Sequence, residues 1–331
     1  MNTFLLTIQQ TATLLIFIFI GYFFRRKNII NDSGKKVLAG LLVNLFSPAY
    51  SIANLSTTIS SDKLVEYLVY LVVCAVLSVF LIFVGIPLAN SFGKDKLQKN
   101  ILKYGFSFGN IGYFGYPLIQ FVFPELLPAY ILFCIPMNIA IATYGYAVLT
   151  EKVDNQPLDG VDQKKKSDVW KRAFLSVPFL GSVVGITLGL LPITVPSFVI
   201  NLCTTAGACQ GITAMLLTGA VLANVPLKKL FTSVKPYVIG AIRLVAIPLV
   251  VLGIFVIINL CGVKGELFKG VAVLAIMASA MPVGMNVVVY PESAGLDSTE
   301  GAKTCFISYI LAVGLMPLMF MLMEVVVNTF V

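Results

Sequence analysis

The feature that most constrains this chain is the recurrence of long apolar runs along its whole length. A transmembrane helix needs about 20 consecutive, mostly apolar residues, and ten runs of about that length follow one another here. They cover approximately residues 3–24, 37–56, 64–90, 101–123, 127–149, 173–191, 197–222, 237–260, 266–290 and 302–325. The pattern predicts an all-α polytopic membrane protein with ten transmembrane helices.

The composition agrees with a lipid bilayer as the surrounding medium. Charged residues make up only 11% of the chain, whereas soluble domains contain roughly 25%. The net charge of +8 indicates loop charges that orient a membrane protein, and we do not expect nucleic-acid binding. The chain has no His and no CxxC pair, so neither a metal site nor a cofactor is expected.

The basic residues alternate between successive loops. Of 23 Lys and Arg residues, 19 lie in or beside the odd-numbered connections between the runs, three lie in or beside the even-numbered ones, and Arg243 lies deeper within a run. Positively charged loops remain on the cytoplasmic side. We therefore predict a multi-pass protein of the cell membrane with both termini external.

A single long polar segment, residues 150–172, divides the chain into residues 1–149 and residues 173–331, each with five runs. Because five is odd, the two halves must enter the membrane in opposite orientations. This is the pattern of an inverted-topology repeat. We predict two inverted five-helix repeats joined by a cytoplasmic linker.

The fourth and ninth runs contain helix-disfavouring residues at matching places. The fourth includes GFSFGNIGYFGYP, residues 105–117, and the ninth includes SAMPVGMNVVVYP, residues 279–291. Gly costs about 1 kcal/mol and Pro about 3 kcal/mol inside a helix. Paired interrupted helices mark transporter binding sites, although Gly and Pro also serve as packing faces and mild kinks. The residues expected to break the helices are Gly109, Gly112, Gly115, Pro117, Pro282 and Gly284.

Two such breaks would favour the binding of an anion. Each offers a half-helix N-terminus with about half a positive charge, and Asn110 and Asn286 would add amide donors for a carboxylate. Of the 15 acidic residues, only Glu66, Glu324 and Glu266, the first residue of its run, fall within the runs, all near their ends. Cation–proton exchange through mid-membrane carboxylates is therefore disfavoured.

Other polar residues lie in the middle of runs and have two interpretations. Asn44, Ser47 and Asn138, and similarly Gln210, could line a cavity or could bond between helices. Arg243 lies about seven residues into its run, roughly 10 Å deep at 1.5 Å per residue. It could extend its side chain to the cytoplasmic interface, or it could face an inner vestibule and attract anions.

The run GFSFGNIGYFGYPLIQ, with N-x-G-x-x-G-x-P from Asn110 to Pro117, resembles the auxin efflux carrier family in its prokaryotic branch. The segments NLFSPAYSIANL and RLVAIPLV resemble the family too. The resemblance implies a fold like that of the bile acid/sodium symporters. A scaffold would contain the first, second, sixth and seventh helices, and a transport domain would contain broken helices 4 and 9, which cross. It also implies a homodimer through the scaffold.

Residues and resemblance together predict a secondary transporter for small organic anions, such as dicarboxylates or auxin-like carboxylates, that works by alternating access. Coupling to H⁺ or Na⁺ is left open. A membrane sensor with a transporter-like core and an anion channel are the alternatives. No enzyme is expected, because HExxH, GxSxG and P-loop motifs are all absent from the sequence.

Overall fold

The computed structural model of the chain describes residues 3–59, 61–151, 175, 177–191, 195–223, 231, 234–293, 296 and 298–330. Within these residues the regular elements are helices, and extended pairing is limited to an isolated bridge between Gly109 and Val283. The predicted linker, residues 150–172, lies almost wholly outside the described residues.

The helices before the linker include three π-helical turns, which interrupt otherwise α-helical segments. In order they are α1 (Thr3–Arg26), α2 (Asp32–Leu41), η1 (Leu42–Phe46), α3 (Ser47–Thr58), η2 (Ser61–Lys63), α4 (Leu64–Phe92), α5 (Lys96–Ser107), η3 (Ile111–Gly115), α6 (Tyr116–Val122), η4 (Pro124–Leu126), α7 (Leu127–Phe133), α8 (Ile135–Ala140), η5 (Ile141–Gly145) and α9 (Tyr146–Leu149).

The described helices after the linker include one further π-helical turn, η6. In order they are α11 (Val177–Leu190), α12 (Ser197–Leu222), α14 (Lys235–Ala241), η6 (Ile242–Ala246), α15 (Ile247–Leu260), α16 (Glu266–Ser279), α17 (Asn286–Ser293) and α18 (Thr299–Phe330).

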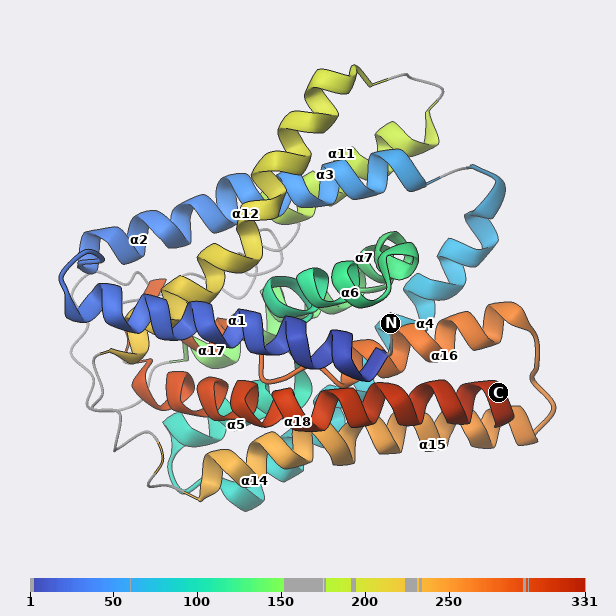
Figure 1. The fold of residues 1–331 in the computed structure, drawn as a ribbon. Helices are drawn as coiled ribbons and strands as arrows, with labels where there is room; N and C mark the ends of the chain where they lie inside the picture. Colours follow the sequence, from blue (N-terminus) through green and yellow to red (C-terminus); the bar gives the residue numbers. More distant parts are fainter. Residues whose placement is uncertain are drawn as a thin grey trace.

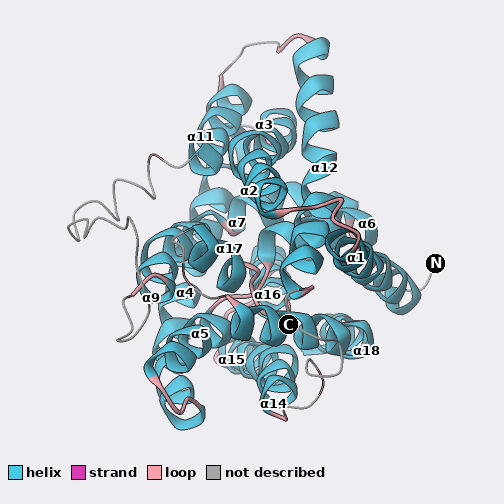
Figure 2. Ribbon diagram, turned by 90° about the vertical axis from the view of Figure 1, so that its left-hand side faces the viewer, coloured by secondary structure: helices cyan, strands magenta, loops and turns pink. Residues whose placement is uncertain are grey.

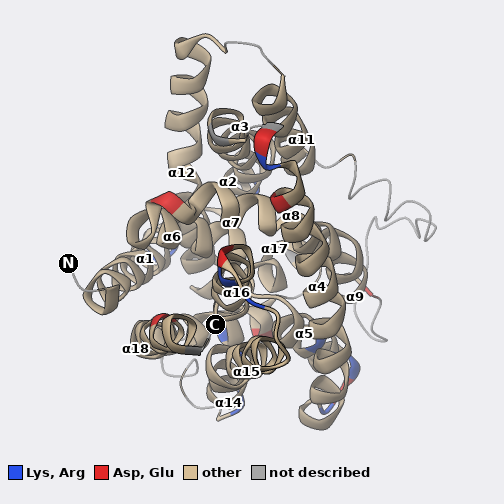
Figure 3. Ribbon diagram, turned by 90° about the vertical axis from the view of Figure 1, so that its right-hand side faces the viewer, with Lys and Arg blue, Asp and Glu red and all other residues tan. Residues whose placement is uncertain are grey.

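Six helical segments of the described chain are long and apolar enough to cross a membrane. A seventh is found if Pro124–Phe133 and Ile135–Leu149, bent by 47°, form one span. They support a multi-pass membrane protein; the finer division into ten spans and two inverted repeats remains a prediction. Long stretches of helix bear no charge (Figure 3). Large apolar side chains are exposed on them, as at Leu68, Val72 and Phe83 of α4, which is the surface that lipid requires.

Local sequence signals explain where the helices begin. The side chain of Asn31 accepts a hydrogen bond from the amide of Gly34 at 2.7 Å and caps α2. The side chain of Asp95 caps α5 in the same way, through the amide of Gln98 at 2.8 Å. Such caps satisfy N–H groups that have no partner within the helix.

The helices pack in two groups. Helix α3 contacts both α11 and α12, and α3 and α11 lie at one side of the molecule, away from α14, α15 and α18 (Figures 1 and 2). Helix α1 packs along both α12 and α18. The start of α1 and the end of α18 lie at the same end of the helices (Figure 1).

Two of the predicted spans are broken in the structure. Helix α5 ends at Ser107 and the next helical turn begins at Ile111, while α16 ends at Ser279 and α17 begins at Asn286. We call residues 108–110 and 280–285 together the crossover. The amide of Asn110 donates to the carbonyl of Pro282 at 2.7 Å. The amide of Gly284 donates to the carbonyl of Phe108 at 3.2 Å, so the two breaks pair in antiparallel fashion.

Gly109, Pro282 and Gly284 lie within these breaks. Gly112 and Gly115 instead lie in the π-helical turn η3, and Pro117 lies in the first turn of α6. Pro has no backbone N–H to donate, and it lies just after the π-helical turn, where the regular bonding of the α-helix is interrupted. The interruption is therefore three residues long in the first half and is confined to the start of the Gly-rich motif.

Candidate functional site

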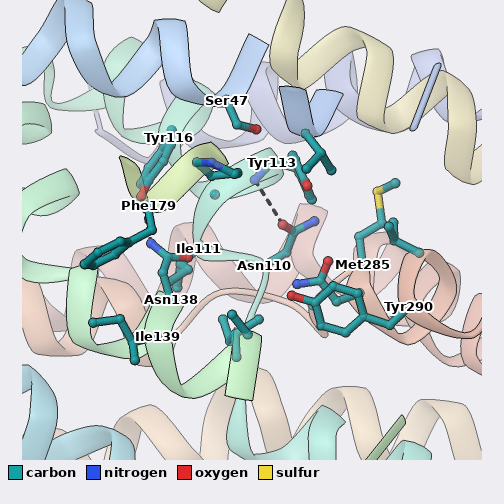
Figure 4. A pocket seen from close by; sticks show the side chains of 18 of the residues that line it. Ser47, Asn110, Ile111, Tyr113, Tyr116, Asn138, Ile139, Phe179, Met285 and Tyr290 are labelled. Atoms are coloured by element: carbon teal, nitrogen blue, oxygen red, sulfur yellow. Dashed lines mark hydrogen bonds between the residues drawn. The ribbon is translucent and has the colours of Figure 1, made fainter. Parts of the chain in front are cut away.

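A cavity of about 260 Å³ lies where the two breaks meet (Figure 4). Its polar lining comes from six different segments of the chain, which are far apart in sequence. The residues of this polar lining are Ser47, Ser51, Tyr104, Asn110, Tyr113, Tyr116, Asn138, Tyr146, Ser182, Gln210, Asn286 and Tyr290. The remaining wall is apolar, apart from the backbone of Gly109, Gly112 and Gly284, and includes Ile135, Ile139, Phe179 and Met285.

Two helix N-termini face this cavity. One is the start of the continuous segment formed by η3 and α6, and the other is the start of α17; Ile111 and Asn286, their first residues, both line the cavity. A helix N-terminus has a partial positive charge from its free N–H groups. Among the described residues that line the cavity, none has a charged side chain.

Asn110 lies at the cavity, but its amide is engaged within the protein. Its Oδ1 accepts a hydrogen bond from the amide of Tyr113 at 3.1 Å, which caps η3 (Figure 4). Its Nδ2 donates to the hydroxyl of Tyr309 at 2.5 Å. Asn110 therefore shapes the helix start, and a direct bond from its amide to a ligand would compete with Tyr309.

The other two asparagines of the cavity repeat this pairing. The amide of Asn286 donates to the hydroxyl of Tyr104 at 3.1 Å, and the amide of Asn138 donates to the hydroxyl of Tyr116 at 3.2 Å. A tyrosine hydroxyl that accepts a hydrogen bond still has its own O–H to donate. Since Tyr104 and Tyr116 line the cavity, their hydroxyls can act as donors to a ligand.

Ser47 lines the cavity, whereas Asn44 does not. The side chain of Asn44 is exposed, and its amide donates to the carbonyl of Gly40 at 2.9 Å within the same helical segment. Asn44 therefore neither lines the cavity nor bonds to another helix through that amide. The π-helical turn η1, which contains Asn44, changes the residue spacing along this helix and so changes which side chains face inward.

Arg243 is wholly buried, with 0% of its surface exposed, and it does not line the cavity. Neither position considered for it from the sequence is observed: the side chain does not extend to an interface, and it does not face the cavity. Its Nε donates to the carbonyl of Met281 at 3.2 Å, and its Nη1 donates to the carbonyl of Phe106 at 3.1 Å. Arg243 thus contacts the backbone at both breaks from outside the cavity.

Gln210 is the lining residue whose side chain most clearly lacks a hydrogen-bond partner. It is 3% exposed, and its Oε1 has no hydrogen-bond partner among the described residues. A buried acceptor without a partner costs free energy, and a ligand with a donor group could supply one. The sequence marked Gln210 as polar in the middle of a span, but it gave no signal for Tyr104 or Tyr116, because aromatic residues are common in membrane helices.

Comparison with known proteins gives the family. The profile described as membrane transport protein matches residues 6–320. An uncharacterized transporter of Methanocaldococcus jannaschii is 31% identical over 127 residues. That alignment covers 36% of this chain and 39% of the relative, so the relative supports the family and no finer statement. Since the profile spans nearly the whole chain, the protein belongs to the membrane transport protein family, which is the auxin efflux carrier family that its sequence resembles.

Proposed function

We propose that this protein is a secondary transporter for small organic anions that works by alternating access in the cell membrane. The observation that supports this most directly is the cavity at the crossover, where two helix N-termini meet and no lining side chain is charged. Helix N-termini and hydroxyl donors together can hold a carboxylate without a fixed cation in contact with it.

The lining supports a carboxylate with a compact organic body. Tyr104 and Tyr116 offer hydroxyl donors, and the apolar wall offers a surface for carbon atoms. Dicarboxylates and auxin-like carboxylates both belong to this class. Because no acidic side chain lines the cavity among the described residues, any coupling would use a proton bound to the substrate, or Na⁺ on neutral oxygens.

The helix contacts support a division into a scaffold and a moving domain. In this proposal the scaffold contains α1, α2, α3, α11 and α12, and the moving domain contains the crossover with the remaining helices. The chain would cross the membrane ten times as two inverted repeats, residues 1–149 and 173–331, with residues 150–172 cytoplasmic and both termini external. Two copies would associate through the scaffold.

The test is uptake of labelled malonate and labelled indole-3-acetate into proteoliposomes, combined with thermal unfolding of the same protein in their presence. A ligand that binds the folded state raises the unfolding temperature. The carrier proposal expects saturable uptake and acceleration by unlabelled substrate on the opposite side. Asn44→Ala is the matched control for variants of the cavity asparagines, because Asn44 is exposed and bonds to its own helix.

The outcomes separate the alternatives. Binding without uptake would indicate a sensor, and uptake that neither saturates nor responds to substrate on the opposite side would indicate a channel. If neither compound binds or is taken up, although the protein is folded, the organic-anion assignment is wrong.

A further inference from the structure

Arg243 is a buried cation with no acidic partner among the described residues. It is the largest of the fully buried side chains, and the described salt bridges lie elsewhere. Its Nη2 also lacks a hydrogen-bond partner in the described chain. A charge in the middle of a membrane helix is costly, so it is retained where it has a function.

One acceptor of Arg243 lies at the end of the first half of a broken helix, and the other lies in the second break. The carbonyl of Phe106 lies in the last turn of α5, and the carbonyl of Met281 lies two residues after the end of α16. The final carbonyls of a helix have no partner within it and give that end a partial negative charge. The guanidinium satisfies the Phe106 carbonyl at the end of α5 and the Met281 carbonyl just beyond α16, and it opposes the partial negative charge there.

Arg243 and the cavity lie at different helix ends of the crossover. The negative end of α5 and the carbonyl of Met281, just beyond α16, are bonded to the guanidinium, while the positive starts of η3 and α17 face the cavity. An anion in the cavity would therefore meet the attractive helix ends, and the repulsive ends would be neutralised behind the crossover. Arg243 acts on the ligand site in this way without contacting the ligand.

Gly109 permits this arrangement. A Cβ atom at Gly109 would lie 2.5 Å from Nη2 of Arg243, 2.8 Å from Cβ of Met281 and 2.9 Å from the carbonyl oxygen of Met281. These separations are too short for any side chain larger than hydrogen. The guanidinium can therefore approach the backbone of both breaks only because residue 109 is glycine.

We propose that Arg243 is a positioning residue that joins the two broken helices into one unit and neutralises the negative charge at the end of α5 and just beyond α16, behind the ligand site. Its joining role is independent of the proposed transport function, and only its effect on anion affinity rests on that function. The proposal differs from a merely stabilising role in one respect. Replacement of Arg243 should loosen the crossover locally, without lowering the stability of the whole protein.

The experiment compares Arg243→Met, Arg243→Lys and the native full-length protein by hydrogen–deuterium exchange and by thermal unfolding. Met has a similar length but removes the charge and both hydrogen bonds, and such replacements of buried charges are often neutral or stabilising overall. Lys→Met at residue 235 is the matched control. Lys235 lies at the start of α14, in the same span, and its Nζ donates to the carbonyl of Phe92 at 3.0 Å and to Gln98 at 2.9 Å, away from the cavity.

In Arg243→Met, we expect the amides of Asn110 and Gly284 to exchange at least about tenfold faster, the factor expected for losing one hydrogen bond to a charged group. The unfolding temperature should stay the same or rise. Arg243→Lys should recover most of the protection, and Lys235→Met should leave these amides unchanged. If Arg243→Met does not fold, Arg243→Gln tests the same point, because it removes the charge and keeps a polar group in the same place.

Two results would overturn the proposal. One is unchanged exchange at Asn110 and Gly284 in Arg243→Met, which would mean that the paired breaks hold themselves together. The other is faster exchange throughout the protein with a lower unfolding temperature, which would mean that Arg243 is only a stabilising residue. Failure of the native protein to bind malonate or indole-3-acetate would count against the proposed function and would leave the exchange measurement valid.

Discussion

The side-chain amide of Asn286 donates a hydrogen bond to the hydroxyl of Tyr104, 3.1 Å away, and so joins the first residue of α17 to a residue of α5 that lies 182 positions earlier. Both residues line the cavity. The bond fixes the orientation of the hydroxyl that accepts it, which leaves the O–H of Tyr104 free to donate toward a ligand. The pair therefore acts as one unit of the site.

We expect Tyr104→Phe to lower the affinity for malonate by roughly tenfold to hundredfold, as the loss of a hydrogen bond to a charge predicts. The ring, which packs on Phe108 with a centroid separation of 5.3 Å, is retained. Ligand-dependent thermal shifts measure the effect. Tyr70→Phe is the control, because the hydroxyl of Tyr70 bonds to Glu66 on α4 and does not line the cavity. The double variant with Asn286→Ala should lose less than the product of the single losses, and simple additivity would contradict the paired role.

Gln210→Leu should weaken the binding of ligands that bear a donor group and should not affect ligands that lack one. Removal of the unpartnered acceptor relieves a desolvation cost, so the unfolding temperature without ligand should not fall. Malate, which has a hydroxyl, should bind more weakly to the variant, whereas succinate, which lacks the hydroxyl, should bind as before. Thermal-shift titrations with both compounds provide the comparison. An equal loss for malate and succinate would mean that Gln210 does not bond to the ligand.

The positions of the breaks could be predicted from the sequence because their cause is local. Gly and Pro disfavour helix wherever the chain places them, so the segments around Gly109, Pro282 and Gly284 were identifiable without knowledge of their neighbours. The length of the first break could not be predicted in this way. Gly112 and Gly115 were expected to interrupt the helix, yet both lie in the π-helical turn η3, where contacts with other helices outweigh the low helix propensity of glycine.

The roles of the polar side chains could not be predicted, because they depend on which helices lie opposite one another. The partner of Asn110 is Tyr309, 199 positions away, and the partners of Arg243 are carbonyls at the ends of two different helices. A sequence shows that a side chain is polar and in the middle of a span. It does not show whether the polar atoms face a cavity or another part of the chain.

Close packing of α1 on α12 predicts a sharp contrast between two glycines. A Cβ atom at Gly219 would collide with the backbone at Ile18 of α1, whereas a Cβ atom at Gly253 would meet no atom within 4 Å. Gly219→Ala should therefore destabilise the protein by about 1–3 kcal/mol through overpacking. Gly253→Ala should be neutral or should stabilise it by about 0.4–1 kcal/mol. Thermal unfolding in detergent measures both, and equal effects would mean that the two helices do not pack so closely.

The predicted orientation can be tested by labelling single cysteines from either side of the membrane, in a variant without the native cysteines. A cysteine at Ser167, in the linker, should react only from the cytoplasmic side. A cysteine at Asn328, near the C-terminus, should react only from outside. The alternation of basic loops is the reason for this expectation. Labelling of both positions from the same side would show that the assignment of the loops is wrong.

Asn110 provides the last prediction, because two substitutions can separate its capping of η3 from its effect on an anion in the cavity. Asn110→Ala removes the cap of η3 and should destabilise the protein by about 1 kcal/mol. Asn110→Asp retains an acceptor for the amide of Tyr113 and so keeps the cap, but it loses the donor to Tyr309. Its carboxylate would repel an anion, so malonate affinity should fall more than in Asn110→Ala at neutral pH. As the pH falls through the pKa of the new carboxyl, that repulsion disappears and the affinity should partly recover. Malonate titrations of both variants at pH 7 and pH 5 measure this, and a pH-independent loss in Asn110→Asp would exclude charge repulsion as its cause.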